Sequence, residues 1–90
     1  MPIPQHIRAG LDRYVKGGIK TGGFLYAVLT NDLFEAVGRA DIESRINLFD
    51  ICDYIYNKVP LSCWGSKEKV KEWIDKFRKK ESQNGNTSTG

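Results

Sequence analysis

The sequence predicts an all-α fold, a single small domain of about four helices. Ninety residues are too few to form two stable cores, so one domain is expected. A content of 40% hydrophobic and 28% charged residues is typical of a globular domain and not of a disordered chain. Apolar residues recur at helical spacing in four stretches, which glycine or proline residues separate. We expect helices over residues 4–16, 23–38, 41–59 and 66–80.

The first helix is indicated by Ile7, Leu11 and Tyr14, whose spacing places them on one helix face. Pro4 suits its first turn, and the pair Gly17-Gly18 ends it, because glycine readily adopts a left-handed conformation after the last turn.

The second helix is predicted over residues 23–38. Its apolar stripe consists of Phe24, Leu25, Val28, Leu29, Leu33 and Val37. The polar residues between the two halves of this stripe, Thr30 to Asp32, are expected to face away from it while the helix continues.

The third helix, over residues 41–59, begins at Asp41 as N-cap and ends before Pro60. Its apolar residues are Ile42, Ile46, Leu48, Phe49, Ile51, Cys52, Ile55, Tyr56 and Val59. They cover more than one face, so this helix is either the centre of the domain or has one side in the core and another on a partner chain. Because a domain this small packs a core only marginally, we expect a homo-oligomer.

The last helix, over residues 66–80, starts at the N-cap Ser66 and has an apolar face of Val70, Trp73, Ile74 and Phe77. Residues 81–90 contain only polar residues and glycine, which cannot repay the entropy of ordering. The chain is therefore expected to divide into a helical domain, residues 1–80, and a disordered tail, residues 81–90.

No enzyme active site can be identified in this sequence, and we expect neither catalytic residues nor a cofactor. Catalysis needs a nucleophile, a base or metal ligands brought together, and the chain has one histidine, His6. Asp50 and Asp53 could share a helix face as paired carboxylates, but we favour a solvated face. Two cysteines, Cys52 and Cys63, with one distant histidine match no common zinc spacing, so free thiols and no metal site are expected.

The segment from Gly17 to Phe24 is the best candidate for a binding site. Glycine amides at Gly22 and Gly23, followed by a helix N-terminus, favour an anion, with Lys20 and Thr21 adding a charge and a hydroxyl. The segment lacks the strand and spacing of a P-loop, so nucleotide hydrolysis is not indicated. The alternative interpretation is a tight corner between two helices.

Two arginines, Arg39 and Arg45, lie at the junction of the second and third helices and could clamp a phosphate or an acidic partner. The alternative is that they bind the terminal carbonyls of the second helix and Asp41.

Trp64 and Tyr26 are the candidate contacts with a partner protein, with capping of the core as the alternative for Trp64 and a place at the core edge for Tyr26. The lysines of the last helix, Lys67, Lys71, Lys76 and Lys80, could touch nucleic acid, although a solvated face is the commoner arrangement. No apolar run is long enough to cross a bilayer and no secretory signal is visible, so we expect a cytoplasmic protein without membrane contact.

The strings IPQHIRAGLDRYV, GGFLYAVLTNDLFEAVGRAD and PLSCWGSKEKVKEWI resemble a group of small proteins of unassigned function encoded by tailed bacteriophages. The similarity spans nearly all of residues 3–75. It implies a non-enzymatic accessory protein in the infected host cell, of the kind that occupies a host protein or sequesters a nucleotide signal used in antiphage defence. It supplies no ligand residues.

Together these observations favour a binding protein and not an enzyme. The first hypothesis is a homo-oligomer that sequesters a phosphate-bearing nucleotide, with Lys20, Thr21, Gly22 and Gly23 as ligands and Arg39 or Arg45 assisting. The second is an inhibitor or adaptor that binds a host protein through Trp64 and exposed helix faces. The third is a nucleic-acid-binding protein that uses the lysine-rich last helix.

Overall fold

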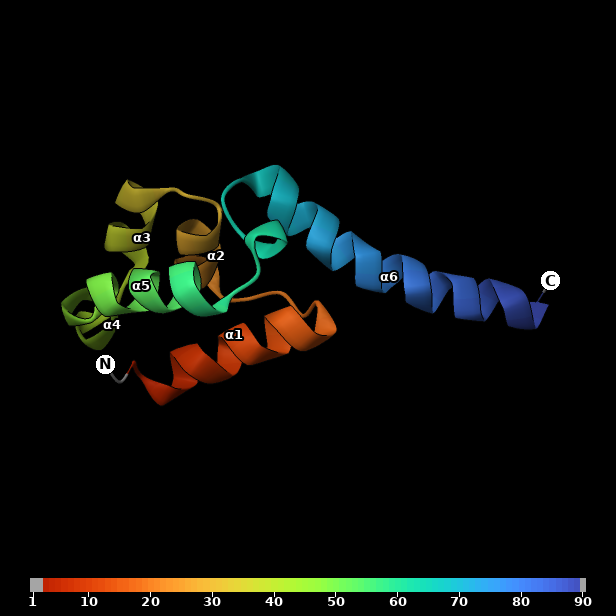
Figure 1. The fold of residues 1–90 in the computed structure, drawn as a ribbon, viewed down its shortest axis with the longest axis horizontal. Helices are drawn as coiled ribbons and strands as arrows, with labels where there is room; N and C mark the ends of the chain where they lie inside the picture. Colours follow the sequence, from red (N-terminus) through yellow and green to blue (C-terminus); the bar gives the residue numbers. More distant parts are fainter. Residues whose placement is uncertain (1–2, 90) are drawn as a thin grey trace.

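The fold is all-helical, as the sequence predicts, in a computed structural model that describes the backbone of residues 3–89 and the side chains of residues 3–78. Within this part the helices are α1 (Gln5–Gly17), α2 (Gly23–Leu29), α3 (Leu33–Arg39), α4 (Ile42–Ile46), α5 (Leu48–Lys58) and α6 (Lys67–Thr89), with a short 3-10 turn, η1 (Leu61–Cys63). Figure 1 shows α3, α4 and α5 gathered at one end of the molecule, while α6 projects from the other. The expectation of about four helices is therefore wrong in number, because two of the predicted helices are each broken once.

The predicted helix over residues 23–38 is broken between Leu29 and Leu33. The Thr30 hydroxyl donates to the carbonyls of Tyr26 and Ala27, and Asn31 takes a left-handed conformation with φ 65°. Asp32 then caps α3 by accepting from the Glu35 amide. Short polar side chains compete with the helical backbone for hydrogen bonds, and asparagine tolerates the left-handed region. These three residues therefore make a turn, where we expected a polar helix face.

The predicted helix over residues 41–59 is also broken, at Asn47. Its backbone, with φ −101° and ψ 15°, leaves the helical region, and its side-chain amide donates to the Glu43 carbonyl. The expected ends are confirmed, because Asp41 accepts from the Ser44 amide and α5 ends before Pro60. That hydrogen bond from the Ser44 amide lowers the pKa of Asp41.

The start of α6 is as expected, since the Ser66 hydroxyl accepts from the Lys69 amide. The backbone is helical as far as Thr89, so the helix continues past residue 80, where we expected it to end. Side chains from residue 79 onward lie outside the described part, and the disordered tail over residues 81–90 stays a prediction.

The core lies between α1, α2, α5 and the first turns of α6. Its members are Ile3, Ile7, Leu11, Tyr14, Leu25, Leu29, Ile51, Ile55, Val59, Cys63 and Val70. The loop before α6 is fastened to α2 by the Gly65 amide, which donates to the Leu29 carbonyl over 2.7 Å. Of the predicted third helix, α5 contributes Ile51 and Ile55 to this core.

Tyr14 joins the first helix to the loop before α6. Its ring is fully buried and its hydroxyl donates to the Cys63 carbonyl over 2.6 Å. The Tyr14 carbonyl in turn accepts from the indole N–H of Trp73 over 3.0 Å. Burial, with a smaller effect of Cys63, raises the pKa of Tyr14 far above its usual range.

Replacing this tyrosine, Tyr14→Phe, should lower the free energy of unfolding by about 1–3 kcal/mol at neutral pH, because a buried carbonyl loses its donor. The unfolded chain releases the tyrosine proton near pH 10 while the folded protein retains it. The contribution of Tyr14 is therefore complete below about pH 10 and is lost as the pH rises above that value. Urea unfolding between about pH 8 and pH 11 checks this. An equally steep loss of stability in the wild-type protein and in Tyr14→Phe would contradict it.

Candidate functional site

A groove with charged walls lies between the loop before α2, the helices α2 and α3, and the first turns of α6. We call it the charged groove, and its volume is about 810 Å³. Its basic lining residues are Lys20, Arg39, Lys67, Lys71 and Arg78, and its acidic ones are Asp32, Glu35, Glu68 and Asp75. A volume of this size is within the range of sites for small organic ligands.

The charged groove brings together four of the six predicted ligand residues, Lys20, Thr21, Gly23 and Arg39, along with Tyr26. Arg39 lies directly over Gly23, where an added Cβ would stand 3.0 Å from its Nη1 atom. A side chain at position 23 would therefore displace the flexible end of Arg39 by a few tenths of an ångström. The Nε atom of Arg39 donates to Glu35 over 3.1 Å, so this arginine is already paired within α3.

The other two predicted ligand residues, Gly22 and Arg45, are not in the charged groove. Gly22 has an ordinary extended backbone, and a Cβ added there would meet nothing within 4 Å. Arg45 instead donates to the Val37 carbonyl at the end of α3 over 3.4 Å, which is the structural alternative considered for it. Because Gly22 and Arg45 do not line this groove, their part in binding an anion stays a prediction.

The charges in the groove partly neutralise one another. Lys71 pairs with Asp75 over 3.2 Å, as Arg39 does with Glu35. The helix that follows the glycines, α2, has only seven residues, so its N-terminus adds little to anion binding. Sequence reasoning missed the contribution of α6 because the spacing within one helix does not say which loop it will face.

A second groove has aromatic walls and lies between α5, the end of α2 and the loop at Trp64. We call it the aromatic groove; its volume is about 310 Å³. Its lining residues are Val28, Asn31, Phe49, Cys52, Asp53, Ile55, Tyr56 and Trp64. Trp64 was predicted as a partner contact, whereas Phe49 and Tyr56 were not. They could have been found from the second apolar stripe at helical spacing within residues 41–59, to which both belong.

Trp64 is held in a fixed position. Its indole N–H donates to the Val59 carbonyl over 3.2 Å, and its ring centroid is 6.0 Å from that of Tyr56. The indole is half-buried, so it both covers the edge of the core and presents part of its ring to the aromatic groove.

Other groups that could act as nucleophiles, bases or metal ligands include the two cysteine thiols and the Asp53 carboxylate. Both cysteines are free, and burial raises the pKa of the Cys52 and Cys63 thiols, which disfavours the nucleophilic thiolate. Asp53 accepts a hydrogen bond from the Asn57 side chain over 3.1 Å. Among the described residues, no group of three or more potential ligands is placed to hold a metal ion.

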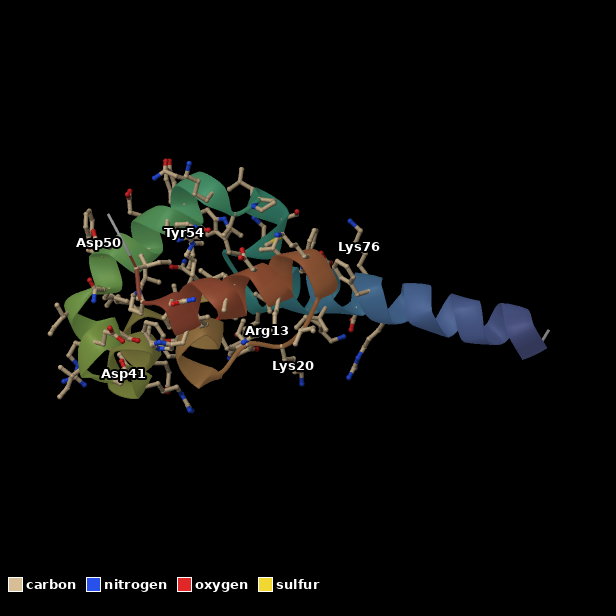
Figure 2. The ribbon with its side chains drawn as sticks, turned by 90° about the horizontal axis from the view of Figure 1, so that it is seen from below. Arg13, Lys20, Asp41, Asp50, Tyr54 and Lys76 are labelled. Carbon is tan, nitrogen blue, oxygen red and sulfur yellow. The ribbon has the colours of Figure 1, made fainter. Side chains whose placement is uncertain are left out.

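The lysines of α6 do not share one role. Lys67 and Lys71 line the charged groove, while the Lys76 ammonium lies 4.8 Å from the centre of the Trp73 ring. The Lys80 side chain lies outside the described residues. Figure 2 shows Lys20 and Lys76 on the side of the domain from which α6 projects, and Asp41 and Asp50 at the end formed by α4 and α5.

Over the described part of the chain, no helix has the length and apolar character required to span a bilayer. Comparison with known protein families, with curated proteins and with solved structures found no match to this chain. The resemblance to phage accessory proteins therefore stays a prediction.

Proposed function

We propose that this protein works by binding a partner protein, without a catalytic step, through exposed apolar side chains of α3, α4 and α5. We call these side chains the outer apolar surface; they are Phe34, Ile42, Ile46, Phe49 and Tyr56. The observation that carries the proposal is their exposure, which is 87% for Phe34 and 82% for Phe49.

These side chains are exposed although the helices that carry them also contribute to the core. The inner side of α4 and α5 is buried, with Ser44, Ile51 and Ile55 below 4% exposure. The outer side carries Ile42 and Ile46, each 77% exposed. The same segment therefore has two apolar sides, of which the domain itself covers one. Apolar surface of this extent on a small domain is typical of an interaction site.

The exposed apolar area could supply part of one side of a specific interface. Aromatic side chains present on the order of 150 Å² or more when exposed. The five residues of the outer apolar surface together therefore expose several hundred Å². One partner contributes about 800 Å² to an interface of standard size. The helices that carry them lie at one end of the molecule, away from the projecting α6 (Figure 1).

If the protein is a phage accessory protein, as the resemblance implies, the partner would be a host protein. The competing possibility is that the outer apolar surface binds a second copy of this chain. Sedimentation velocity over a range of concentrations, followed by capture from a host lysate, separates the two. We expect Phe49→Glu to weaken a stoichiometric complex by at least about tenfold, because a charge would be buried in the interface.

Ile19→Glu is the matched control, because Ile19 is also an exposed apolar residue but lies in the loop before α2, away from the outer apolar surface. It should leave the complex intact. A protein that stays monomeric and captures nothing, or a complex insensitive to Phe49→Glu, would overturn the proposal.

A second candidate function is the binding of a phosphate-bearing ligand in the charged groove. It is favoured by the convergence of Lys20, Thr21 and Arg39 from separate segments with Lys71 and Arg78 of α6. Tyr26, which is partly exposed there, would stack on a base. Thermal-shift measurements with pyrophosphate and with nucleotides test this function. A stabilisation that is lost in Arg39→Gln would support it, and no shift at millimolar ligand would reject it.

A further inference from the structure

The aromatic groove has a composition that differs sharply from that of the charged groove. Three of its walls are aromatic rings, those of Phe49, Tyr56 and Trp64. Of its lining residues one is charged, Asp53, and this residue is acidic. The remaining lining residues are aliphatic or neutral, so the groove offers π-faces and one carboxylate to whatever enters it.

The helix geometry of α5 puts these groups on one side. Phe49, Asp53 and Tyr56 are separated by four and three residues, the spacing that places side chains on a single helix face. Phe49 and Tyr56 are both more than two-thirds exposed, so neither ring is used by the core.

Trp64 and Asp53 are held in place before any ligand arrives. Trp64 is fixed by its hydrogen bond to the Val59 carbonyl and by its contact with the Tyr56 ring. The carboxylate of Asp53 is oriented by the Asn57 amide. A site whose groups are already positioned loses less entropy on binding.

Rings and a carboxylate together select a cation. The face of an aromatic ring attracts an ammonium or guanidinium group within about 6 Å. A carboxylate adds a charge-assisted hydrogen bond, for which the planar guanidinium of arginine is best suited. An anion would be repelled by Asp53, and a purely apolar ligand would offer no donor to the oxygen of this carboxylate that does not accept from Asn57.

We propose that the aromatic groove receives an arginine or lysine side chain of a partner protein, from a segment whose neighbouring residues are apolar. This inference rests on the proposed function, because Phe49 and Tyr56 belong both to the groove and to the outer apolar surface. The volume of about 310 Å³ is at the low end for ligand sites, which suits one long side chain better than a larger molecule.

The test uses two tripeptides, acetyl-Leu-Arg-Leu-amide and the same peptide with citrulline in place of arginine. Citrulline has nearly the shape of arginine and no charge, so the pair isolates the effect of the cation. Binding is followed by NMR through the indole N–H signals of the two tryptophans. Trp64 lines the groove, while Trp73 donates to the Tyr14 carbonyl elsewhere and serves as an internal reference.

We expect the arginine peptide to shift the Trp64 signal selectively and to bind about three- to fivefold more tightly than the citrulline peptide. Asp53→Asn should reduce this preference, because the carboxylate charge is lost while the aromatic rings remain. Asp50→Asn is the matched control, because Asp50 is an acidic residue of the same helix outside the groove lining, and it should retain the preference. Equal binding of the two peptides, a preference that is undiminished in Asp53→Asn, or no Trp64 shift would overturn the inference.

The two proposals fail in different ways. A complex that is weakened by Phe49→Glu but unaffected by Asp53→Asn would leave the docking surface in place and reject the cation site. Selective binding of the arginine peptide by a protein that forms no Phe49-dependent complex would keep the cation site and reject the proposed function.

Discussion

Gly18→Ala should destabilise the protein by about 3 kcal/mol, a decrease in melting temperature on the order of 15 °C for a domain of this size. Gly18 follows α1 with φ 64°, a left-handed conformation that costs alanine about 1 kcal/mol. An added Cβ would also stand 2.6 Å from Cγ and 2.8 Å from Cβ of Phe77. Because these atoms are close to the backbone of α6, a rotation of the ring alone cannot remove the clash.

Gly22→Ala provides the control for this substitution. Gly22 has a negative φ and open space around the position of a Cβ, but it is the N-cap of α2, where alanine is less favourable than glycine, so the substitution should change the stability by less than about 1 kcal/mol. Thermal unfolding followed by circular dichroism measures both variants. Equal melting temperatures for Gly18→Ala and the wild-type protein would show that α6 does not pack against Gly18 as described.

Ile51→Ala should destabilise the protein far more than Ile46→Ala, although the chemical change is the same. Ile51 is completely buried, and its truncation should cost about 2–5 kcal/mol by leaving a cavity in the core. Ile46 is 77% exposed, so its truncation should change the stability of the monomer by less than about 0.5 kcal/mol. Urea unfolding at low protein concentration measures these values without a contribution from association.

The same pair also tests the proposed function. Ile46→Ala should weaken the complex formed through the outer apolar surface while leaving the fold intact, because a buried methyl-rich side chain is removed from the interface. A large loss of monomer stability in Ile46→Ala would mean that this side chain is part of the core and does not belong to the outer apolar surface.

The helix ends were the part of the fold most readily predicted. Asp41 and Ser66 cap the helices that follow them, Pro60 ends α5, and Gly18 takes the left-handed conformation after α1. Each of these signals acts over a few residues of the chain, through a hydrogen bond or a restricted backbone angle. A single sequence therefore contains them completely.

The breaks at Asn31 and Asn47 could not be inferred in the same way. A polar residue within an apolar stripe is compatible both with a solvated helix face and with a turn. At Asn31 the turn lets α3 fold back beside α2, so Leu29 can be buried while Leu33 is exposed. Which arrangement occurs depends on the packing of α2 and α3, and this is a property of the whole domain.

The candidate site shows the same division. The loop residues Lys20 to Gly23 and the nearby Arg39 were predicted as candidate ligands from their residue types. In the structure the Arg39 side chain lies close to Gly23. That α6 forms one wall of the charged groove, and that Arg45 lies outside it, depends on distances between segments far apart in the chain.

The sequence by itself determined that this protein is helical, where most helices begin and end, and that the segment around α5 has more apolar residues than one face can hold. Those features follow from local backbone preferences and from spacing along a helix. Only the tertiary structure decided which apolar side is buried, because burial depends on what the other helices place opposite it. For the same reason it alone showed that Phe49, Asp53, Tyr56 and Trp64 form one groove.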